Sequence, residues 1–302
     1  MTRLGRLVRS ALWSLVRKSE VLGPVAIRAR GWLRRRRETA VRKRKETAIA
    51  RHGPVAPDEL LGVLREGGIR EGDTVFAQPS VENMPTFGGP PIALLEMLRT
   101  LVGDSGTLLM PTYTTSDVRT DVCKADYLFD VNRSPTYTGV VSELLRRMPG
   151  AVRSAHPRHS IAGIGPQAAA LLQSHEFCYP ADGADSPFDR LRKLERAWIL
   201  TLGLPPASMS FLHWIEDMEL ERSQKAVAAG AALEQRVRTS DGSVIVVRDV
   251  ERPANVGLNH NWVAVRLSPA AMQYFRYRQI DIGIYPAGVL AKELLALRVR
   301  SR

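Results

Sequence analysis

Hydrophobic residues recur at two different spacings along the chain, and these spacings distinguish helices from strands. Between residues 57 and 222, short apolar runs alternate with segments in which apolar positions recur every three or four residues. The runs predict strands at 73–77, 107–110, near 161 and at 198–202, and the longer segments predict helices at 57–66, 92–101, 140–148 and 210–221. Strands that alternate with helices predict an α/β domain built on a layered sheet.

The pattern changes in the last third of the chain. Residues 235–239 and 244–248 alternate apolar and polar positions on either side of Asp241-Gly242, which is a strong hairpin signal. A further strand is predicted at Asn261–Leu267, and the chain ends in a predicted helix, Pro286–Leu297.

The first 51 residues form a basic arm that is distinct from the rest of the chain. They hold 16 of the 43 Lys and Arg residues and 3 of the 31 Asp and Glu residues, a net charge of +13, so the remainder carries −1. Residues 3–17 have the spacing of a basic amphipathic helix. After a break at Gly23-Pro24 come the runs 34–37 and 42–45, which contain only Arg and Lys. We therefore divide the chain into an arm, residues 1–51, and a catalytic domain, residues 52–302.

The charge of the arm has two interpretations. In the first, the arm attaches the protein to an anionic membrane surface or to RNA. In the second, it is a solvated helical arm or a homodimer contact. No aromatic-rich RNA-binding motif accompanies the charges, which makes nucleic acid the weaker partner.

Composition and motifs exclude several classes of protein. No run of about 18 uncharged apolar residues is present, as a membrane span requires, and no secretory signal is recognisable. Cys123 and Cys178 belong to no metal-binding spacing, so two reduced thiols in a cytoplasmic protein are expected, without a structural metal. The phosphate-binding loop, the dinucleotide fingerprint, the serine-hydrolase elbow and the zinc-protease motif are all absent.

Histidines carry the best candidate chemistry. His213 and Glu216 lie three residues apart in a predicted helix that follows the strand 198–202, so they share a helix face near a strand end. A carboxylate in that position can orient an imidazole and raise its basicity. A surface ion pair is the alternative. The segment His156-Pro157-Arg158-His159-Ser160, which follows Arg153-Ser154, is a second candidate, either as a phosphate or catalytic cradle or as a polar turn set by Pro157.

Six collinear stretches of the chain form a recognisable set: GDTVFAQPSV (72–81), GTLLMPTYT (106–114), SPTYTGVVSELLRRMPGAVRSAHPRHSIAGIGPQA (134–168), GADSPFDRL (183–191), WILTLGLP (198–205) and SFLHWIEDME (210–219). Taken in order, they resemble the aminoglycoside 3-N-acetyltransferase family, also called the antibiotic N-acetyltransferase family. The resemblance spans about residues 58–222, is weaker beyond, and leaves out the arm.

The resemblance implies a three-layer α/β/α sandwich with a central mixed sheet, acetyl-coenzyme A as cosubstrate, no metal, and the amino group of an aminoglycoside or related aminosugar as acceptor. It places the family's reactive histidine on His213, with Glu216 as its acid. The cofactor then passes Ser80, Val81, Tyr113, Thr114, Arg153 and Ser154, and His156 is the third catalytic candidate.

Two departures from the family stand out. Gln78-Pro79-Ser80 replaces the usual His-Ser-Ser. The family's Asn-Asp-His context, which supplies an acid, has Leu258-Asn259-His260-Asn261 as its nearest match, and Asp249 is a candidate substitute for the acid.

The resulting hypothesis is direct transfer. His213 removes a proton from the amine as it attacks the thioester, and backbone N–H groups near Ser80 or Thr138 stabilise the oxyanion. One alternative is an acyltransferase that acts on a cell-envelope polysaccharide precursor, held peripherally at the inner membrane face by the arm. The other is a non-catalytic relative that binds membrane or nucleic acid.

Overall fold

The computed structural model describes residues 22–114, 127–222, 232–250 and 260–300. The chain divides into two units, residues 1–53 and 54–302. In the first, helix α2 spans Leu22–His52, and Gly53 ends it with a positive φ of 74°. The helix carries 11 Lys and Arg residues against two Glu residues, which confirms a helical, basic segment in the arm. The predicted amphipathic helix at 3–17 lies outside the described residues.

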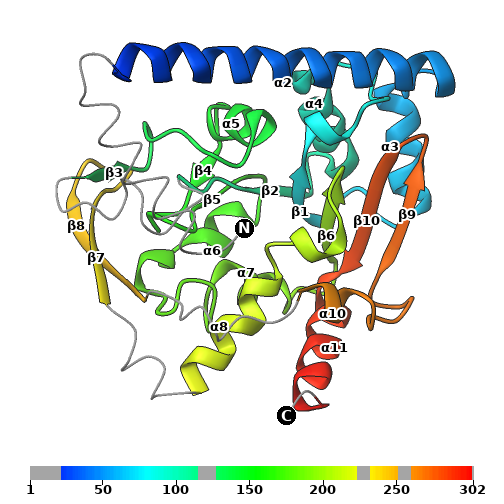
Figure 1. The fold of residues 1–302 in the computed structure, drawn as a ribbon. Coiled ribbons are helices and arrows are strands. Elements are labelled where there is room, and N and C mark those ends of the chain that lie inside the picture. The colour runs from blue at the N-terminus through cyan, green and yellow to red at the C-terminus, as the bar shows by residue number, and fades with distance from the viewer. Residues whose placement is uncertain (1–21, 115–126, 223–231, 251–259, 301–302) are drawn as a thin grey trace. The chain divides into compact units, whose positions relative to one another are not determined.

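A seven-stranded mixed sheet is the centre of the second unit (Figure 1), with the strand order β4-β5-β2-β1-β6-β10-β9. Its strands are β1 Thr74–Pro79, β2 Thr107–Pro111, β4 Val152–Arg153, β5 Ile161–Ile164, β6 Ala197–Leu202, β9 Gln273–Tyr277 and β10 Ile280–Pro286. β1 lies between β2 and β6 and is parallel to both, whereas β5 and β10 run antiparallel to their neighbours. The carboxyl ends of β1, β2 and β6 therefore meet at one edge of the sheet.

Helices cover both faces of this sheet and complete the three predicted layers. They are α3 Pro57–Glu66, α4 Pro91–Val102, α5 Val140–Arg146, α6 Ala168–Leu172, α7 Pro187–Leu191, α8 Leu212–Arg222, α10 His260–Ala264 and α11 Ala287–Arg300. Alternate residues of β1 separate the two cores. Val75 and Ala77 pack with α3, α4 and α5, while Phe76 packs with α6, α7, α8 and α11.

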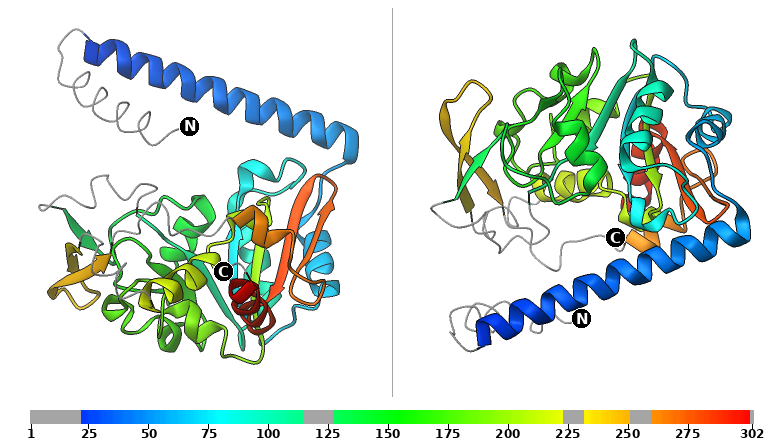
Figure 2. Two further views of the ribbon diagram at one scale, coloured as in Figure 1. Left: turned by 60° about the horizontal axis from the view of Figure 1, so that its bottom comes forward. Right: turned by 90° about the horizontal axis from the view of Figure 1, so that it is seen from above.

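A second, three-stranded sheet lies apart from the main one. Strands β7 Ala232–Arg238 and β8 Val244–Val250 form the predicted hairpin, in which Gly242 has a φ of 91°, and β3 Leu128–Asp130 joins its edge. The hairpins β7–β8, in gold, and β9–β10, in orange, lie at opposite ends of the unit in both views of Figure 2.

The prediction for residues 261–267 was wrong. The segment contains helix α10 instead of a strand, and strands β9 and β10 follow it. The turn between β9 and β10 has positive φ at Arg278 and Gln279, 41° and 70°. Glycine and asparagine are the usual residues at such positions, so Arg278 and Gln279 did not indicate this hairpin.

Among the described residues, no helix combines the length and the hydropathy that crossing a lipid bilayer requires.

Candidate active site

The site lies where the parallel strands β1, β2 and β6 end. Ser80 and Val81 follow β1, and Tyr113 and Thr114 come shortly after β2. After β6 the chain turns at Gly203, whose φ is 71° and where a Cβ would meet the carbonyl oxygen of Ser80 at 2.8 Å. This close approach requires glycine. The edge of the sheet therefore brings the first predicted cofactor residues beside the segment that leads into α8.

A buried glutamine fixes the start of α8. The Gln78 side-chain amide donates from Nε2 to Ser210 Oγ at 2.8 Å, and its Oε1 accepts from the Ser210 backbone N–H at 2.8 Å. Ser210 in turn accepts from the backbone N–H of His213 at 2.9 Å. The residue that departs from the family's pattern at position 78 thus ties β1 to the first turn of the helix that carries His213.

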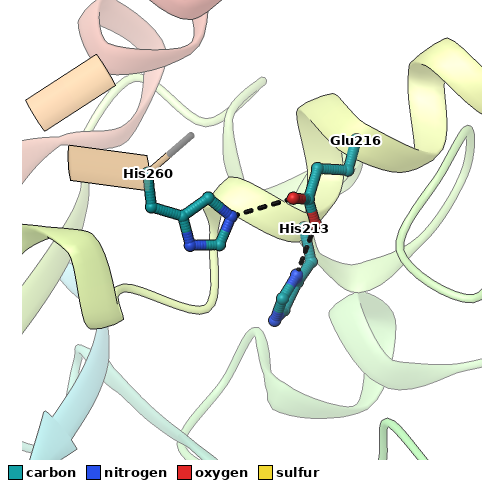
Figure 3. A group of neighbouring side chains, drawn as sticks. All are labelled: His213, Glu216 and His260. Carbon is teal, nitrogen blue, oxygen red and sulfur yellow. Dashed lines mark hydrogen bonds and ion pairs between the residues drawn. The ribbon is translucent and has the colours of Figure 1, made fainter. Parts of the chain in front are cut away.

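One carboxylate joins two histidines at the centre of the site (Figure 3). His213 Nδ1 lies 2.7 Å from Glu216 Oε2, and His260 Nε2 lies 2.9 Å from Glu216 Oε1. The other nitrogen of His260, Nδ1, lies 3.0 Å from the carbonyl oxygen of Ala207. Glu216 is buried, while the side chains of His213 and His260 keep 31% and 23% of their surface exposed. We call these three residues the triad.

The hydrogen bond to Glu216 determines the tautomer of His213. An ionised carboxylate only accepts hydrogen bonds, so His213 Nδ1 carries the hydrogen and Nε2 carries the lone pair. In Figure 3 this second nitrogen points away from Glu216. The arrangement presents a basic nitrogen on a partly exposed ring.

The triad is one end of a row of five imidazoles. Adjacent ring centroids are 5.7 Å apart for His260 and His213, 6.2 Å for His213 and His159, 5.7 Å for His159 and His156, and 4.9 Å for His156 and His175. Five of the six histidines of the chain therefore gather here. Their spacing in the sequence offered no reason to place them together.

The inner end of the row is buried. His156 and His175 are both fully buried, and burial lowers the pKa of His175 to about 4 and that of His156 well below its ordinary value. His156 Nδ1 accepts a hydrogen bond from the backbone N–H of His159 at 3.1 Å. His159 stands between His156 and His213, so the structure does not bring the predicted third catalytic residue next to the triad.

A second pair of histidine and carboxylate lies beside the first. His159 Nδ1 is 2.7 Å from Oδ2 of the fully buried Asp182, at the distance of an ion pair but without the direction of a hydrogen bond. The Asp182 backbone N–H donates to Asp217 on α8 at 2.9 Å. The ring of Tyr113 lies 5.4 Å from that of His159, which links this predicted cofactor residue to the row.

Two other predicted cofactor residues are engaged inside the protein. All three nitrogens of the Arg153 guanidinium donate within the fold, with Nη1 to the Ser134 carbonyl at 2.6 Å and Nη2 to the Thr112 carbonyl at 2.6 Å. Burial lowers its pKa to about 9. Ser154 Oγ accepts from the Ile161 backbone N–H at 3.0 Å and contacts His175 Nδ1 at 2.8 Å. These contacts hold β4 and β5 in place.

The predicted oxyanion donors are also engaged. The Ser80 N–H donates to the Leu202 carbonyl at 2.8 Å, and the Thr138 N–H donates to Thr136 Oγ1 at 3.1 Å. The side chain of Thr114 donates to the carbonyl of Pro157 at 2.6 Å. Neither predicted backbone N–H is therefore directed at a substrate oxygen.

Two remaining candidates have other roles. Asp249, the predicted substitute for the family's acid, forms a buried ion pair with Arg158. Burial raises the pKa of the Cys178 thiol to about 12, which keeps it from acting as a nucleophile near neutral pH. Cys123 lies outside the described residues.

Comparison with known proteins agrees with this architecture. The family model for aminoglycoside 3-N-acetyltransferase matches residues 78–265, a range that includes the whole triad. Aminoglycoside N(3)-acetyltransferase IX of Micromonospora chalcea is 27% identical over 257 residues, which cover 81% of this chain and 83% of that protein. Aminoglycoside N(3)-acetyltransferase VIII of Streptomyces fradiae is also 27% identical over 257 residues, with 81% and 82% covered.

Solved structures share the fold. The crystal structure of the aminoglycoside acetyltransferase AAC(3)-Xa has a TM-score of 0.66 at 25% identity and covers 86% of this chain and 95% of that one. AAC-IIIb with CoASH has a TM-score of 0.65 at 21% identity, with 81% and 97% covered. With the family match over more than half of its length, the chain belongs to the aminoglycoside 3-N-acetyltransferase family and is an acetyltransferase.

Proposed function

We propose that this acetyltransferase moves an acetyl group from acetyl-coenzyme A to an amino group of an aminoglycoside or related aminosugar, with His213 as the general base. The observation that carries the proposal is the hydrogen bond between His213 Nδ1 and Glu216, 2.7 Å long, on a partly exposed ring. It leaves the Nε2 lone pair of His213 to accept a proton. The related structures named for CoASH and for bound sisomicin, at 21% and 24% identity, support the choice of donor and acceptor.

The reaction requires a base because an ammonium ion has no lone pair. His213 Nε2 takes one proton from the amine as the amine nitrogen attacks the thioester carbonyl, and the carbon–sulfur bond then breaks to release coenzyme A. Glu216 holds the imidazole in the required tautomer and stabilises the imidazolium that forms. For cofactor contacts we retain Ser80, Val81, Tyr113 and Thr114 at the sheet edge, and we omit Arg153 and Ser154 because their side chains hold β4 and β5 together. We also omit His156 from the catalytic residues because it is fully buried and His159 separates it from the triad.

Release of free thiol from acetyl-coenzyme A tests the proposal directly. The wild-type chain should release thiol with at least one member of a panel of aminoglycosides and simpler aminosugars. His213→Gln should lower kcat by about 10²–10⁴-fold, the usual contribution of a general base, with coenzyme A binding by calorimetry unchanged. Cys178→Ser is the matched control and should keep wild-type kcat. A His213→Gln variant with normal kcat contradicts the assignment of the base.

The arm supports a second candidate, an aminosugar acceptor located at a membrane surface. Helix α2 carries a net charge of +9, and the family match begins at residue 78, beyond it. Arg42, Lys43 and Arg44 are consecutive and exposed, so positive charge points in several directions around the helix. Such a helix suits attraction to anionic lipid headgroups, worth about 1 kcal/mol per basic residue near the surface.

Vesicle sedimentation tests this candidate with the full-length chain. The wild type should sediment with phosphatidylglycerol vesicles and stay in solution with phosphatidylcholine vesicles, and the attraction should weaken with added salt. A variant in which residues 42–45 are all replaced by Gln should sediment less with phosphatidylglycerol vesicles and should release thiol at the wild-type rate. Equal sedimentation of the wild type with both kinds of vesicle, or stronger binding to RNA than to anionic vesicles, contradicts membrane attachment.

A further inference from the structure

The contacts of His260 require a proton or a metal ion between this residue and Glu216. Its Nδ1 faces the carbonyl oxygen of Ala207 at 3.0 Å, and a carbonyl only accepts, so Nδ1 carries a hydrogen. A neutral imidazole has one N–H, which leaves a lone pair on Nε2. That nitrogen lies 2.9 Å from a carboxylate oxygen of Glu216. Two lone pairs repel at this distance, so either a second proton or a metal ion must lie between them.

The triad also provides a suitable set of metal ligands. One nitrogen from His213, one from His260 and one oxygen from Glu216 all lie within 4.8 Å of one another. Two imidazoles and a carboxylate form a common ligand set for Zn²⁺, which binds at about 2.0–2.2 Å and leaves a fourth position for water or another ligand. The contact from His260 Nδ1 to a backbone carbonyl is the outer contact that orients most metal-binding histidines. Figure 3 shows both rings turned toward the same carboxylate.

We propose that the triad is a binding site for a divalent ion of the zinc class, and that the bound ion inhibits acetyl transfer. When the ion binds, the Nε2 proton of His260 leaves to solvent, and the proton of His213 moves from Nδ1 to Nε2. The ion then holds both nitrogens that face Glu216. Because His213 Nε2 now carries a hydrogen, it cannot accept the proton of the amine. The inhibitory part rests on the proposed function, whereas the binding site does not.

Metal binding can be measured on the full-length chain without an assay of activity. After treatment with a chelator and removal of any affinity tag, the protein is titrated with Zn²⁺ in competition with a chromogenic zinc indicator. We expect one equivalent of high-affinity binding. Co²⁺ should give the visible absorption of a four-coordinate site, which reports the geometry in the wild-type protein.

Three variants locate the ion. Glu216→Gln keeps the shape of the side chain, and His260→Ala removes one ligand. Each should weaken Zn²⁺ binding by about 100-fold, because loss of a residue that only orients a ligand already costs about 10–100-fold in metal affinity. His159→Ala is the matched control, because its ring lies 6.2 Å from that of His213 and it is also paired with a carboxylate. The Zn²⁺ affinity of His159→Ala should stay within about 2-fold of the wild-type value. Binding that survives in both triad variants, or no stoichiometric binding to the wild type, overturns the proposal.

The activity measurement separates this inference from the proposed function. Thiol release should stop at the free Zn²⁺ concentration that fills the site and return on addition of chelator. Stoichiometric binding in a protein that acetylates no amine on the panel leaves the metal site standing and removes the proposed function. Acetyl transfer that continues with the site filled refutes the inhibition and leaves the function intact.

Discussion

Replacement of Gln78 by alanine tests whether the contact between β1 and α8 sets the catalytic geometry. The substitution removes two buried hydrogen bonds of 2.8 Å and leaves the backbone N–H of Ser210 without its acceptor. A buried donor left unsatisfied costs about 1–3 kcal/mol. In a domain of this size, a loss of about 2 kcal/mol lowers the unfolding midpoint by about 4–8 °C.

The expected effect on rate is larger than the effect on stability. Ser210 accepts from the backbone N–H of His213, so a shift of the loop moves the base. Misplacement of a catalytic group by about 1 Å can cost about 100-fold. We therefore expect kcat of Gln78→Ala to fall by about 10- to 100-fold, measured by thiol release at a temperature where the variant is fully folded.

Two companion variants isolate the cause. Ser210→Ala removes only the side-chain bond and keeps the backbone bond, so its kcat should lie between those of the wild type and Gln78→Ala. Gln78→Glu keeps an acceptor for the Ser210 N–H, while the Ser210 hydroxyl can donate to the other oxygen, so it should recover most of the rate. If Gln78→Ala loses stability but keeps the wild-type kcat, the start of α8 does not control His213 and the reasoning fails.

Three further predictions concern buried ionisable groups. Arg158→Leu should destabilise the fold by about 3–5 kcal/mol in urea unfolding, because it leaves the Asp249 carboxylate buried without its partner, and Arg158→Leu with Asp249→Leu should recover much of that loss. Burial lowers the pKa of His175 from 6.5 to about 4, so the unfolded chain binds more protons than the folded chain between these pH values. The free energy of unfolding should therefore fall as pH drops from 6.5 toward 4, by up to about 1.4 kcal/mol per pH unit. His175→Asn should flatten this dependence of stability on pH. Cys178, with a pKa of about 12, should resist thiol reagents at pH 8 in the folded protein and react after unfolding, as mass spectrometry can show.

The local pattern of apolar residues was enough to predict most strands of the central sheet. The runs at 73–77, 107–110 and 198–202 became β1, β2 and β6 because a strand buried on both faces reads as a continuous apolar segment. The same reasoning placed His213 and Glu216 on one helix face after a strand. Spacing could therefore predict contacts between residues that are near in sequence. The 2.7 Å hydrogen bond between His213 and Glu216 confirms that these two side chains share a helix face.

Contacts between distant segments could not be predicted in this way. Gln78 and Ser210 are 132 residues apart, and the pair of His159 and Asp182 joins two loops. Arg153 gives a second example: a basic residue beside Ser and His predicted a phosphate contact, and in the structure it ends β4 and its guanidinium donates to backbone carbonyls. Whether an arginine faces solvent or the interior depends on the tertiary fold, which composition does not reveal.

His260 shows how an error in secondary structure can hide a site residue. The alternation at 261–267 predicted a strand, and His260 would then lie just before that strand, with no predicted partner. In the structure it begins helix α10, and its ring reaches Glu216, 44 residues away in sequence. The acid that was sought beside His260 is therefore on α8, already bonded to His213. A single carboxylate serves both imidazoles, so a variant of Glu216 removes the support of the base and the partner of His260 together, whereas His260→Ala leaves the support of His213 in place.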